Sequence, residues 1–295
     1  MAAHTAGRPF WFLRTCRYFS VINALSALDA KPKTDPKIRV EGVSKDFVRN
    51  GRTLSALKNV DLYAGDGELV SIIGPSGCGK STLLNVLAGL DEPTTGTIYL
   101  NGRRAEQRLG TVGYMQQKDL LLPWRNVVDN AILGLELQGV AKHVARARAI
   151  ELAERFGLKG FEKEPPYALS GGMRQRASFL RTVLADQDVF LLDEPFAALD
   201  ALNREQLQEW LLGLWESLGK TIVLVTHDVD EAIFLSDRIY VMTASPGRIK
   251  LVASVELPRP RSLDVVTQPS FVALKARLLA SIRDEREPLR EDVVI

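Results

Sequence analysis

The segment GPSGCGKST, residues 74–82, places three glycines ahead of a lysine and two hydroxyl residues. This is the spacing of a phosphate-binding loop, G-x-x-x-x-G-K-[ST]. Glycines allow the backbone to turn successive N–H groups toward phosphate oxygens, and a helix beginning near Lys80 adds the positive end of its dipole. An apolar run precedes the segment and helical periodicity follows it. The sequence therefore predicts a nucleotide site in which Lys80 contacts the β- and γ-phosphates and Ser81 coordinates Mg²⁺.

All residues of this loop are predicted to line the nucleotide, namely Gly74, Pro75, Ser76, Gly77, Cys78, Gly79, Lys80, Ser81 and Thr82. Cys78 has two interpretations. It is either a small residue that fits the loop, or a thiol whose pKa is lowered by the adjacent helix start. The second interpretation predicts that alkylation of Cys78 blocks nucleotide binding and that ATP protects the thiol.

Two acidic residues follow another apolar run in VFLLDEP, residues 189–195. An apolar strand brings Asp193 and Glu194 to its carboxyl end, where open parallel sheets bind ligands. Asp193 is predicted to orient Mg²⁺, and Glu194 is predicted to polarise the attacking water of an ATPase. An exposed acidic turn would explain an isolated Asp-Glu pair, but the phosphate loop earlier in the chain favours the catalytic interpretation.

Two more predicted strands end in polar side chains. GTVGYMQQ ends at Gln117, which is predicted to bind Mg²⁺ and water, and TIVLVTH ends at His227, which is predicted to contact the γ-phosphate. A single histidine at a strand end is more often structural. Several chemically capable side chains at the ends of strands in one sheet favour the functional interpretation.

The segment LSGGMRQR, residues 169–176, places two glycines at what reads as a helix start. Glycine inside a helix costs roughly 1 kcal/mol relative to alanine. Ser170 is a good N-cap and needs no function to explain it. A hydroxyl, bare N–H groups and a positive helix end at Ser170, Gly171 and Gly172 would nevertheless suit a second anion.

The elements that must position these residues alternate between strands and helices, which predicts a parallel α/β sheet. Strand patterns cover 37–47, 56–64, 67–74, 96–102, 110–117, 189–195, 221–227 and 238–244. Helical patterns cover 81–90, 126–158, 203–219 and 270–286, the last of which is expected to pack on the body of the protein.

Composition excludes several classes of protein. The formal net charge of +2 gives no reason to expect nucleic acid or an anionic membrane as the main partner. Two distant cysteines make no disulfide framework and favour a reducing compartment. The best membrane-span candidate, residues 9–28, is interrupted by Arg14 and Arg17. If the protein works at a membrane, other chains must span it.

Residues 1–37 form an aromatic and basic extension that ends in a linker-like stretch. Three interpretations compete: an interfacial amphipathic segment, a targeting segment, or translated sequence upstream of the true start. We favour the last, and otherwise expect the extension to be disordered. Mass spectrometry of the native N-terminus decides, because a peptide containing residues 10–14 would exclude a mis-assigned start.

Taken together, the motifs resemble the nucleotide-binding subunit of an ATP-binding cassette (ABC) transporter. The phosphate loop alone marks a vast superfamily, whereas LSGGMRQR combined with LDEP and THD is highly specific. The resemblance covers about 38–257. It implies a P-loop NTPase core with a parallel sheet, an antiparallel β subdomain and an inserted helical subdomain at about 118–175. Residues 258–295 are then a C-terminal helix and tail.

The resemblance also implies roles for individual residues. Gln117 matches the glutamine of the Q-loop (residues 117–123) because it lies six residues before Pro123. Glu194 matches the catalytic glutamate, Asp200 the aspartate of the D-loop (residues 198–200), and His227 the histidine of the switch loop (residues 226–228). Phe47 matches the aromatic residue that stacks on adenine, although a strand core residue explains it equally well.

Several segments look like the subgroup that serves nitrate, sulfonate, taurine and related small-solute importers. These are LLPWRNVVDN, HDVDEAIFLSDRIYVM and SPGRI, together with Met173 where the family often has glutamine. RASFLRT, residues 176–182, is less typical of that subgroup. In the family, the segment after the Q-loop docks on the membrane partner, so 120–127 is the predicted coupling surface. Trp124 within it is expected to contact the partner, although it also fits a core position.

The resemblance implies a head-to-tail homodimer in which each ATP lies between the phosphate loop of one subunit and the LSGGM segment of the other. It implies integral-membrane permease subunits, an indirect link to a solute-binding protein, no nucleic acid, and a peripheral position at the cytoplasmic face of the inner membrane. Two rival functions are a soluble cassette ATPase of DNA repair or translation and a nucleotide-gated scaffold without catalysis. The single cassette argues against the first, and Glu194 with His227 argues against the second. Export is the alternative to import, but exporters often fuse the cassette to membrane helices.

Overall fold

The computed structural model describes residues 36–197 and 199–283, without the side chains of residues 201–203, 214 and 218. The predicted N-terminal extension lies outside these residues except for its last two positions, as do residues 284–286 of the predicted C-terminal helix. In the described part of the chain, no helix combines the length and the apolar character needed to cross a membrane.

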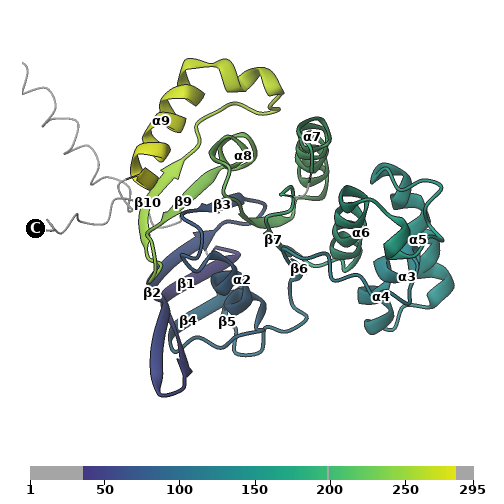
Figure 1. Cartoon of the computed structure of the whole chain (residues 1–295), viewed down its shortest axis with the longest axis horizontal. Coiled ribbons are helices and arrows are strands. Elements are labelled where there is room, and N and C mark those ends of the chain that lie inside the picture. Colours follow the sequence, from purple (N-terminus) through teal and green to yellow (C-terminus); the bar gives the residue numbers. More distant parts are fainter. Residues whose placement is uncertain (1–35, 198, 284–295) are drawn as a thin grey trace, which may run out of the picture. The chain divides into compact units, whose positions relative to one another are not determined.

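The strands that lead to the predicted site residues belong to a six-stranded sheet (Figure 1). Its order is β10-β9-β3-β8-β7-β6. Neighbours are parallel from β9 to β6, and β10 joins antiparallel at the edge. The strands are β3 (Leu69–Ile73), β6 (Gly113–Met115), β7 (Val189–Asp193), β8 (Thr221–Val225), β9 (Arg238–Met242) and β10 (Ile249–Ser254).

A separate antiparallel sheet has the order β2-β1-β4-β5. Its strands are β1 (Ile38–Arg49), β2 (Arg52–Ala64), β4 (Thr95–Leu100) and β5 (Arg103–Arg104). The first two are longer than the sequence patterns predicted, because β1 and β2 continue as an exposed hairpin beyond the half-buried region. Irregular register near the middle of β1 interrupts the alternation on which those patterns depend.

Helices occur at the predicted positions, and a further short helix at residues 229–235 was not predicted. They are α2 (Lys80–Ala88), α3 (Val127–Ala131), α4 (Leu133–Leu137), α5 (Lys142–Arg155), α6 (Gly171–Leu184), α7 (Ala201–Leu218), α8 (Val229–Leu235) and α9 (Pro269–Arg283), with short 3₁₀ turns at Pro166–Ala168 and Leu263–Thr267. The pattern at 126–158 is three helices rather than one. Gly139, with φ of 81°, takes the left-handed conformation that ends a helix.

Each face of the six-stranded sheet packs against its own hydrophobic layer. Along β7, Phe190 and Leu192 belong to one buried cluster, and Val189 and Leu191 belong to the other. This follows from the two-residue period of a strand. One layer contains α2 and the inner face of β1 and β2, and the other contains α6 to α9 and the helices α3 to α5.

Three aromatic rings pack together between α5, α6 and α7. Phe156 follows α5, Phe179 lies in α6, and Trp210 lies in α7. The centroids of the Phe156 and Trp210 rings are 4.3 Å apart, and Phe179 packs edge-on against both. Such pairs add to the hydrophobic stabilisation of the contact, so α6 is held from both sides.

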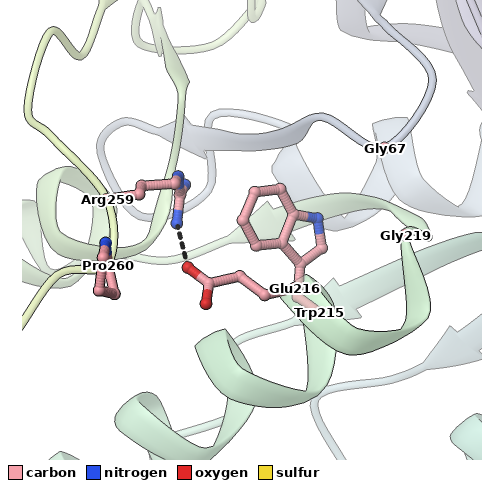
Figure 2. A pocket seen from close by; sticks show the side chains of 6 residues that line it. All are labelled: Gly67, Trp215, Glu216, Gly219, Arg259 and Pro260. Carbon is pink, nitrogen blue, oxygen red and sulfur yellow. Dashed lines mark ion pairs between the residues drawn. The ribbon is translucent and has the colours of Figure 1, made fainter.

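The segment after β10 returns over the end of α7 (Figure 2). The Arg259 guanidinium lies 4.1 Å from the centre of the Trp215 ring and pairs with Asp237 at 2.8 Å and Glu216 at 3.9 Å. These contacts form the wall of an open pocket of about 460 Å³. Arg261, two residues on, donates to backbone carbonyls at the end of α8. The C-terminal segment is thereby fastened to the sheet domain.

Candidate functional site

The carboxyl ends of β3, β6, β7 and β8 lie at one edge of the sheet, because these strands are parallel neighbours. This edge gathers the phosphate loop, Gln117, the acidic pair and the switch loop, as the sequence predicted. Ser170, Phe47 and Asp200 come from other elements: the start of α6, the β1–β2 hairpin and the segment before α7.

The phosphate loop joins β3 to α2, which begins at Lys80. Gly77 and Gly79 have φ of 77° and 104°, backbone angles that residues with a Cβ rarely adopt. The buried Lys80 ammonium donates to the carbonyls of Gly74 at 2.9 Å and Pro75 at 3.0 Å. The lysine is therefore folded over the loop, within reach of whatever the loop binds.

The expectation of a reactive Cys78 thiol is wrong. Cys78 is 1% exposed, and burial raises the pKa of its thiol above the ordinary value. The Lys80 ammonium, 3.8 Å from Cys78 Sγ, lowers the pKa but does not outweigh the loss of water. The side chain points into the layer beneath the loop, so the alternative interpretation of a small residue that fits the loop holds.

A backbone contact that the sequence did not suggest supports the loop from behind. Gly247 donates its N–H to the Ala56 carbonyl and accepts from the Lys58 N–H, both at 2.9 Å. A Cβ at Gly247 would lie 2.1 Å from the Cys78 carbonyl oxygen. SPGRI was noted only as a family-like segment; a Pro-Gly pair just after the strand pattern at 238–244 was the available signal.

The buried edge beside Lys80 provides oxygen ligands that suit Mg²⁺. Asp193 is 3% exposed, its Oδ1 has no hydrogen-bond partner, and its side chain is hydrogen bonded to Ser81. Burial raises the pKa of Asp193, and the nearby Glu194 raises it further, while Ser81 and Lys80 lower it. An unsatisfied buried carboxylate oxygen next to a hydroxyl fits a hard cation, which completes its shell with water and phosphate oxygens.

Two predicted catalytic side chains and the predicted Mg²⁺ ligand Gln117 meet at one oxygen. The amide of Gln117 donates to Glu194 Oε2 at 3.2 Å, and Nδ1 of His227 lies 3.4 Å from the same oxygen. They come from the ends of three different strands, β6, β7 and β8. Their meeting requires the parallel order of the sheet, and it places a carboxylate, an amide and an imidazole around one small volume.

The backbone of Glu194 is held in an unusual conformation. Its φ is 50°, and left-handed non-glycine residues of this kind cluster at functional sites. Its N–H donates to the Val225 carbonyl at 2.9 Å, and its carbonyl accepts from the Gln175 amide at 3.2 Å. Gln175 lies in α6 and was not predicted to have a role; its amide joins α6 to the backbone of Glu194.

The start of α6 is built as the sequence predicted for a helix cap. The Ser170 hydroxyl accepts from the Met173 N–H at 3.3 Å. A methyl group at Gly172 would come within 2.9 Å of Leu199 Cδ2, so Gly172 packs closely against a side chain of its own subunit. Gly171 is exposed, and the nearest atom to a Cβ there would be 3.8 Å away. Packing within this chain therefore does not explain the missing side chain at Gly171.

Two more predicted binding residues lie at the surface. Phe47 is 37% exposed on the β1–β2 hairpin, with Lys45 Nζ 4.9 Å from its ring centre. Asp200 is exposed immediately before α7. The roles of both residues remain predictions.

The segment after Gln117 is attached to α6. Arg181 donates to the carbonyls of Asp119 and Leu120, and Arg174 pairs with the Asp119 carboxylate at 3.1 Å. Trp124, just beyond, is 77% exposed. The alternative interpretation of Trp124 as a core residue is therefore wrong.

Comparison with known proteins gives a consistent picture. Residues 57–197 match the family described as ABC transporter. The chain is 44% identical over 242 residues to the aliphatic sulfonates import ATP-binding protein SsuB of Bacillus cereus, covering 82% of this chain and 94% of SsuB. It is 39% identical over 256 residues to the taurine import ATP-binding protein TauB of Pseudomonas aeruginosa, covering 85% and 97%.

A solved structure agrees in fold. The dimeric ATP-binding cassette MJ0796, in a post-hydrolysis state bound to ADP and Pi, is 31% identical with a TM-score of 0.69, covering 75% of this chain and 100% of that one. The chain belongs to the family of ABC transporter ATP-binding proteins. The resemblance, the cassette fold and the ATPase class predicted from the sequence are confirmed.

Proposed function

We propose that this chain is the ATP-hydrolysing subunit of an importer for a small solute of the nitrate, sulfonate or taurine class. The importer names of its relatives support the transport role. The observation that carries the catalytic part is the meeting of Gln117, Glu194 and His227 at one carboxylate oxygen, beside the phosphate loop.

In this mechanism the phosphate loop holds the ATP phosphates with its N–H groups and Lys80. Glu194 takes a proton from water as the water oxygen attacks the γ-phosphorus in line. The bond from that phosphorus to the bridging oxygen breaks, ADP leaves with the electron pair, and the proton passes from Glu194 to solvent. Gln117 and His227 hold the Glu194 carboxylate and contact the water and γ-phosphate.

Asp193 and Ser81 would hold Mg²⁺, with Gln117 as the third protein ligand. Bound there, the cation would offset negative charge on the phosphates. The chain's own contribution is the pre-formed pair of Asp193 and Ser81 at the buried end of β7.

Two copies of the chain complete two ATP sites in a head-to-tail dimer. Ser170 and Gly171 present a hydroxyl, an open backbone and a positive helix end to the γ-phosphate held by the partner. The exposed Gly171 supports this arrangement, because the nearest atom to a Cβ there would be Nη2 of Arg174, at an ordinary contact distance of 3.8 Å. Phe47 stacks on adenine, and Asp200 lies at the interface between the two copies.

Permease subunits bind the segment after the Q-loop, where Leu120 and Trp124 are exposed apolar side chains. The chain lies at the cytoplasmic face of the inner membrane, and a solute-binding protein acts through the permease. Attachment of this segment to α6 through Arg181 gives a mechanical route from the ATP site to the membrane partner.

Replacement of Glu194 with Gln tests the catalytic assignment. Loss of the proton acceptor is expected to slow ATP hydrolysis by about a hundredfold or more while ATP binding persists. Size-exclusion chromatography with ATP should then show a stable dimer of the variant. The wild-type chain with ADP is the control, and rapid turnover by the variant would contradict the role given to Glu194.

A further inference from the structure

A buried carboxyl group lies beneath the switch loop and has no role in the mechanism above. Glu231, in α8, is 6% exposed, and Thr226, at the end of β8, is 2% exposed. The Thr226 hydroxyl donates to Glu231 Oε2 at 2.5 Å and accepts from the Asp228 N–H at 3.0 Å. One hydroxyl thus joins the buried acid to the turn that carries His227.

This arrangement fixes the turn on both sides of the histidine. The hydroxyl of Thr226 reaches past His227 to the N–H of Asp228, and Asp228 in turn caps α8 by accepting from the N–H groups of Asp230 and Glu231. His227 is therefore the only residue of this turn whose side chain lies mainly in solvent, where its Nδ1 faces Glu194.

The helix α7 contacts the same group from the other side. Arg204 lies 3.8 Å from the Asp228 carboxylate and donates to the Leu199 carbonyl at 3.1 Å. Gln208, one turn further along α7, is hydrogen bonded to Glu231. The D-loop and the switch loop are therefore connected through one helix face and one buried acid.

The charges around Glu231 nearly balance. Asp228 and Arg204 face it with opposite charges, Lys275 of α9 pairs with Asp230, and Arg261 is directed to carbonyls at the end of α8. Burial raises the pKa of Glu231 to about 7, helped by Asp228 and opposed by Thr226, Arg204 and Gln208.

We propose that Glu231 is a positioning residue for ATP hydrolysis, which acts through Thr226 to hold the switch loop with His227 facing Glu194. Arg204 and Gln208 join this group to the D-loop. The proposal rests on the catalytic function proposed above. Because none of these residues belongs to the phosphate loop, their loss affects hydrolysis rather than ATP binding.

The first test reads the position of His227 directly, without activity. The chain has three histidines, so histidine-labelled full-length protein gives few ring signals in NMR, and loss of one in His227→Gln assigns His227. Thr226→Val and Glu231→Ala are expected to shift or broaden the His227 signal and leave that of His143, on exposed α5, unchanged. An unchanged His227 signal in both variants would overturn the proposal.

The second test separates positioning from folding by kinetics. Thr226→Val is expected to lower kcat about tenfold or more while KM for ATP changes less than about twofold, and Thr226→Ser should restore most of the rate. In a His227→Ala background, Glu231→Ala should lower the residual rate by no more than about twofold. Independent, fully multiplying effects would contradict action through His227.

The third test uses pH and the conservative variant Glu231→Gln, which keeps an acceptor for Thr226 but cannot ionise. Since the folded state holds the Glu231 proton more tightly than the unfolded chain, stability should fall as pH rises from about 4.5 to about 7. The Gln variant should lose that part of the pH dependence of unfolding and keep the His227 signal. Equal pH dependence in both proteins would exclude a buried, titrating Glu231.

These tests remain distinguishable from a failure of the proposed function. A wild-type chain that did not hydrolyse ATP would refute the catalytic role, yet the NMR and pH measurements would still report on Glu231. Conversely, an active enzyme whose His227 signal ignores Thr226 and Glu231 would refute only the positioning role.

Discussion

At the residue scale, two adjacent acids have different environments. Asp193 is buried next to Ser81 and Lys80 at the end of β7, which suits a cation ligand. Glu194 turns out of the strand with a left-handed backbone, so its carboxylate meets Gln117 and His227 instead. Adjacent positions in the sequence thus have the two environments that the proposed cation ligand and the proposed proton acceptor require.

Gly247 provides a test of how tightly the phosphate loop is supported. In Gly247→Ala the new methyl group would lie 2.1 Å from the Cys78 carbonyl oxygen, so the loop must move. We expect weaker ATP binding by about tenfold and a loss of about 1–3 kcal/mol in the free energy of unfolding. Titration with a fluorescent ATP analogue and urea unfolding measure the two effects.

The matched control is Gly213→Ala on α7, where a Cβ meets nothing within 4 Å. Alanine in a helix should leave stability unchanged or raise it by about 1 kcal/mol, with ATP binding as in the wild type. Equal ATP affinity in the Gly247 and Gly213 variants would show that the loop does not depend on this contact.

The buried Cys78 thiol should react slowly. In a Cys16→Ser background, an aromatic disulfide reagent at pH 8 is expected to label the native chain about a hundredfold or more slower than the unfolded chain, because little accessible thiolate is present. The absorbance of the aromatic thiol that the reagent releases measures the labelling rate. Labelling of the native chain within about tenfold of the unfolded rate would contradict the burial of this side chain.

At the scale of elements, α6 connects three parts of the site. Its first turn carries Ser170, Gln175 supports the Glu194 carbonyl, and Arg174 and Arg181 hold the segment after Gln117. Movement of this helix would therefore displace both the Glu194 backbone and the predicted coupling surface. RASFLRT, which departs from the subgroup pattern, contains Arg181, which donates to the carbonyls of Asp119 and Leu120.

Trp124 tests the coupling surface. Trp124→Ala should leave ATP binding by the isolated chain within about twofold of the wild type, since the indole is exposed and its residue lies outside the phosphate-loop segment at 74–82. Solute uptake in membrane vesicles with the permease should fall about tenfold or more, as expected for a large anchor at an interface. The control is Val272→Ala, which replaces an exposed apolar side chain on a different element, α9. Unchanged uptake in the Trp124 variant would exclude this docking surface.

At the scale of the whole molecule, one chain carries two phosphate-compatible structures that come from separate elements. The phosphate loop begins α2, and the Ser170 cap begins α6. In each structure, backbone N–H groups are available to a phosphate. In a head-to-tail pair of chains, the phosphate loop of one chain and the α6 start of the other would contact the same ATP. The proposed dimer would explain the missing side chain at Gly171, which packing within one chain does not explain.

Ser170→Arg tests the dimer. The arginine should leave ATP binding by the monomer within about twofold but prevent closure on the partner's γ-phosphate, because its bulk and length fill the opening at the helix end. In a Glu194→Gln background, light scattering should show no ATP-induced dimer. Ser270→Arg, the same replacement at an exposed serine of α9, is the matched control. An ATP-induced dimer of the Ser170 variant would refute this use of the segment.

The sequence by itself determined the local chemistry. Glycine spacing determined the phosphate loop, two-residue and 3.6-residue periods determined most strands and helices, and apolar runs ending in Asp193, Gln117 and His227 determined which residues share a sheet edge. These signals are local, because they depend on backbone conformation and side chains within a few residues. The division of 126–158 into three helices escaped them, since tertiary packing overrides propensity in short helices.

Only the tertiary structure decided what each residue touches. It showed that Cys78 is buried, that Gly247 supports a loop about 170 residues earlier, and that the hydroxyl of Thr226, the residue before His227, donates to the buried Glu231. Burial, desolvation and close backbone approach depend on segments far apart in sequence. They are set by how the sheet and its helices pack, and not by any single motif.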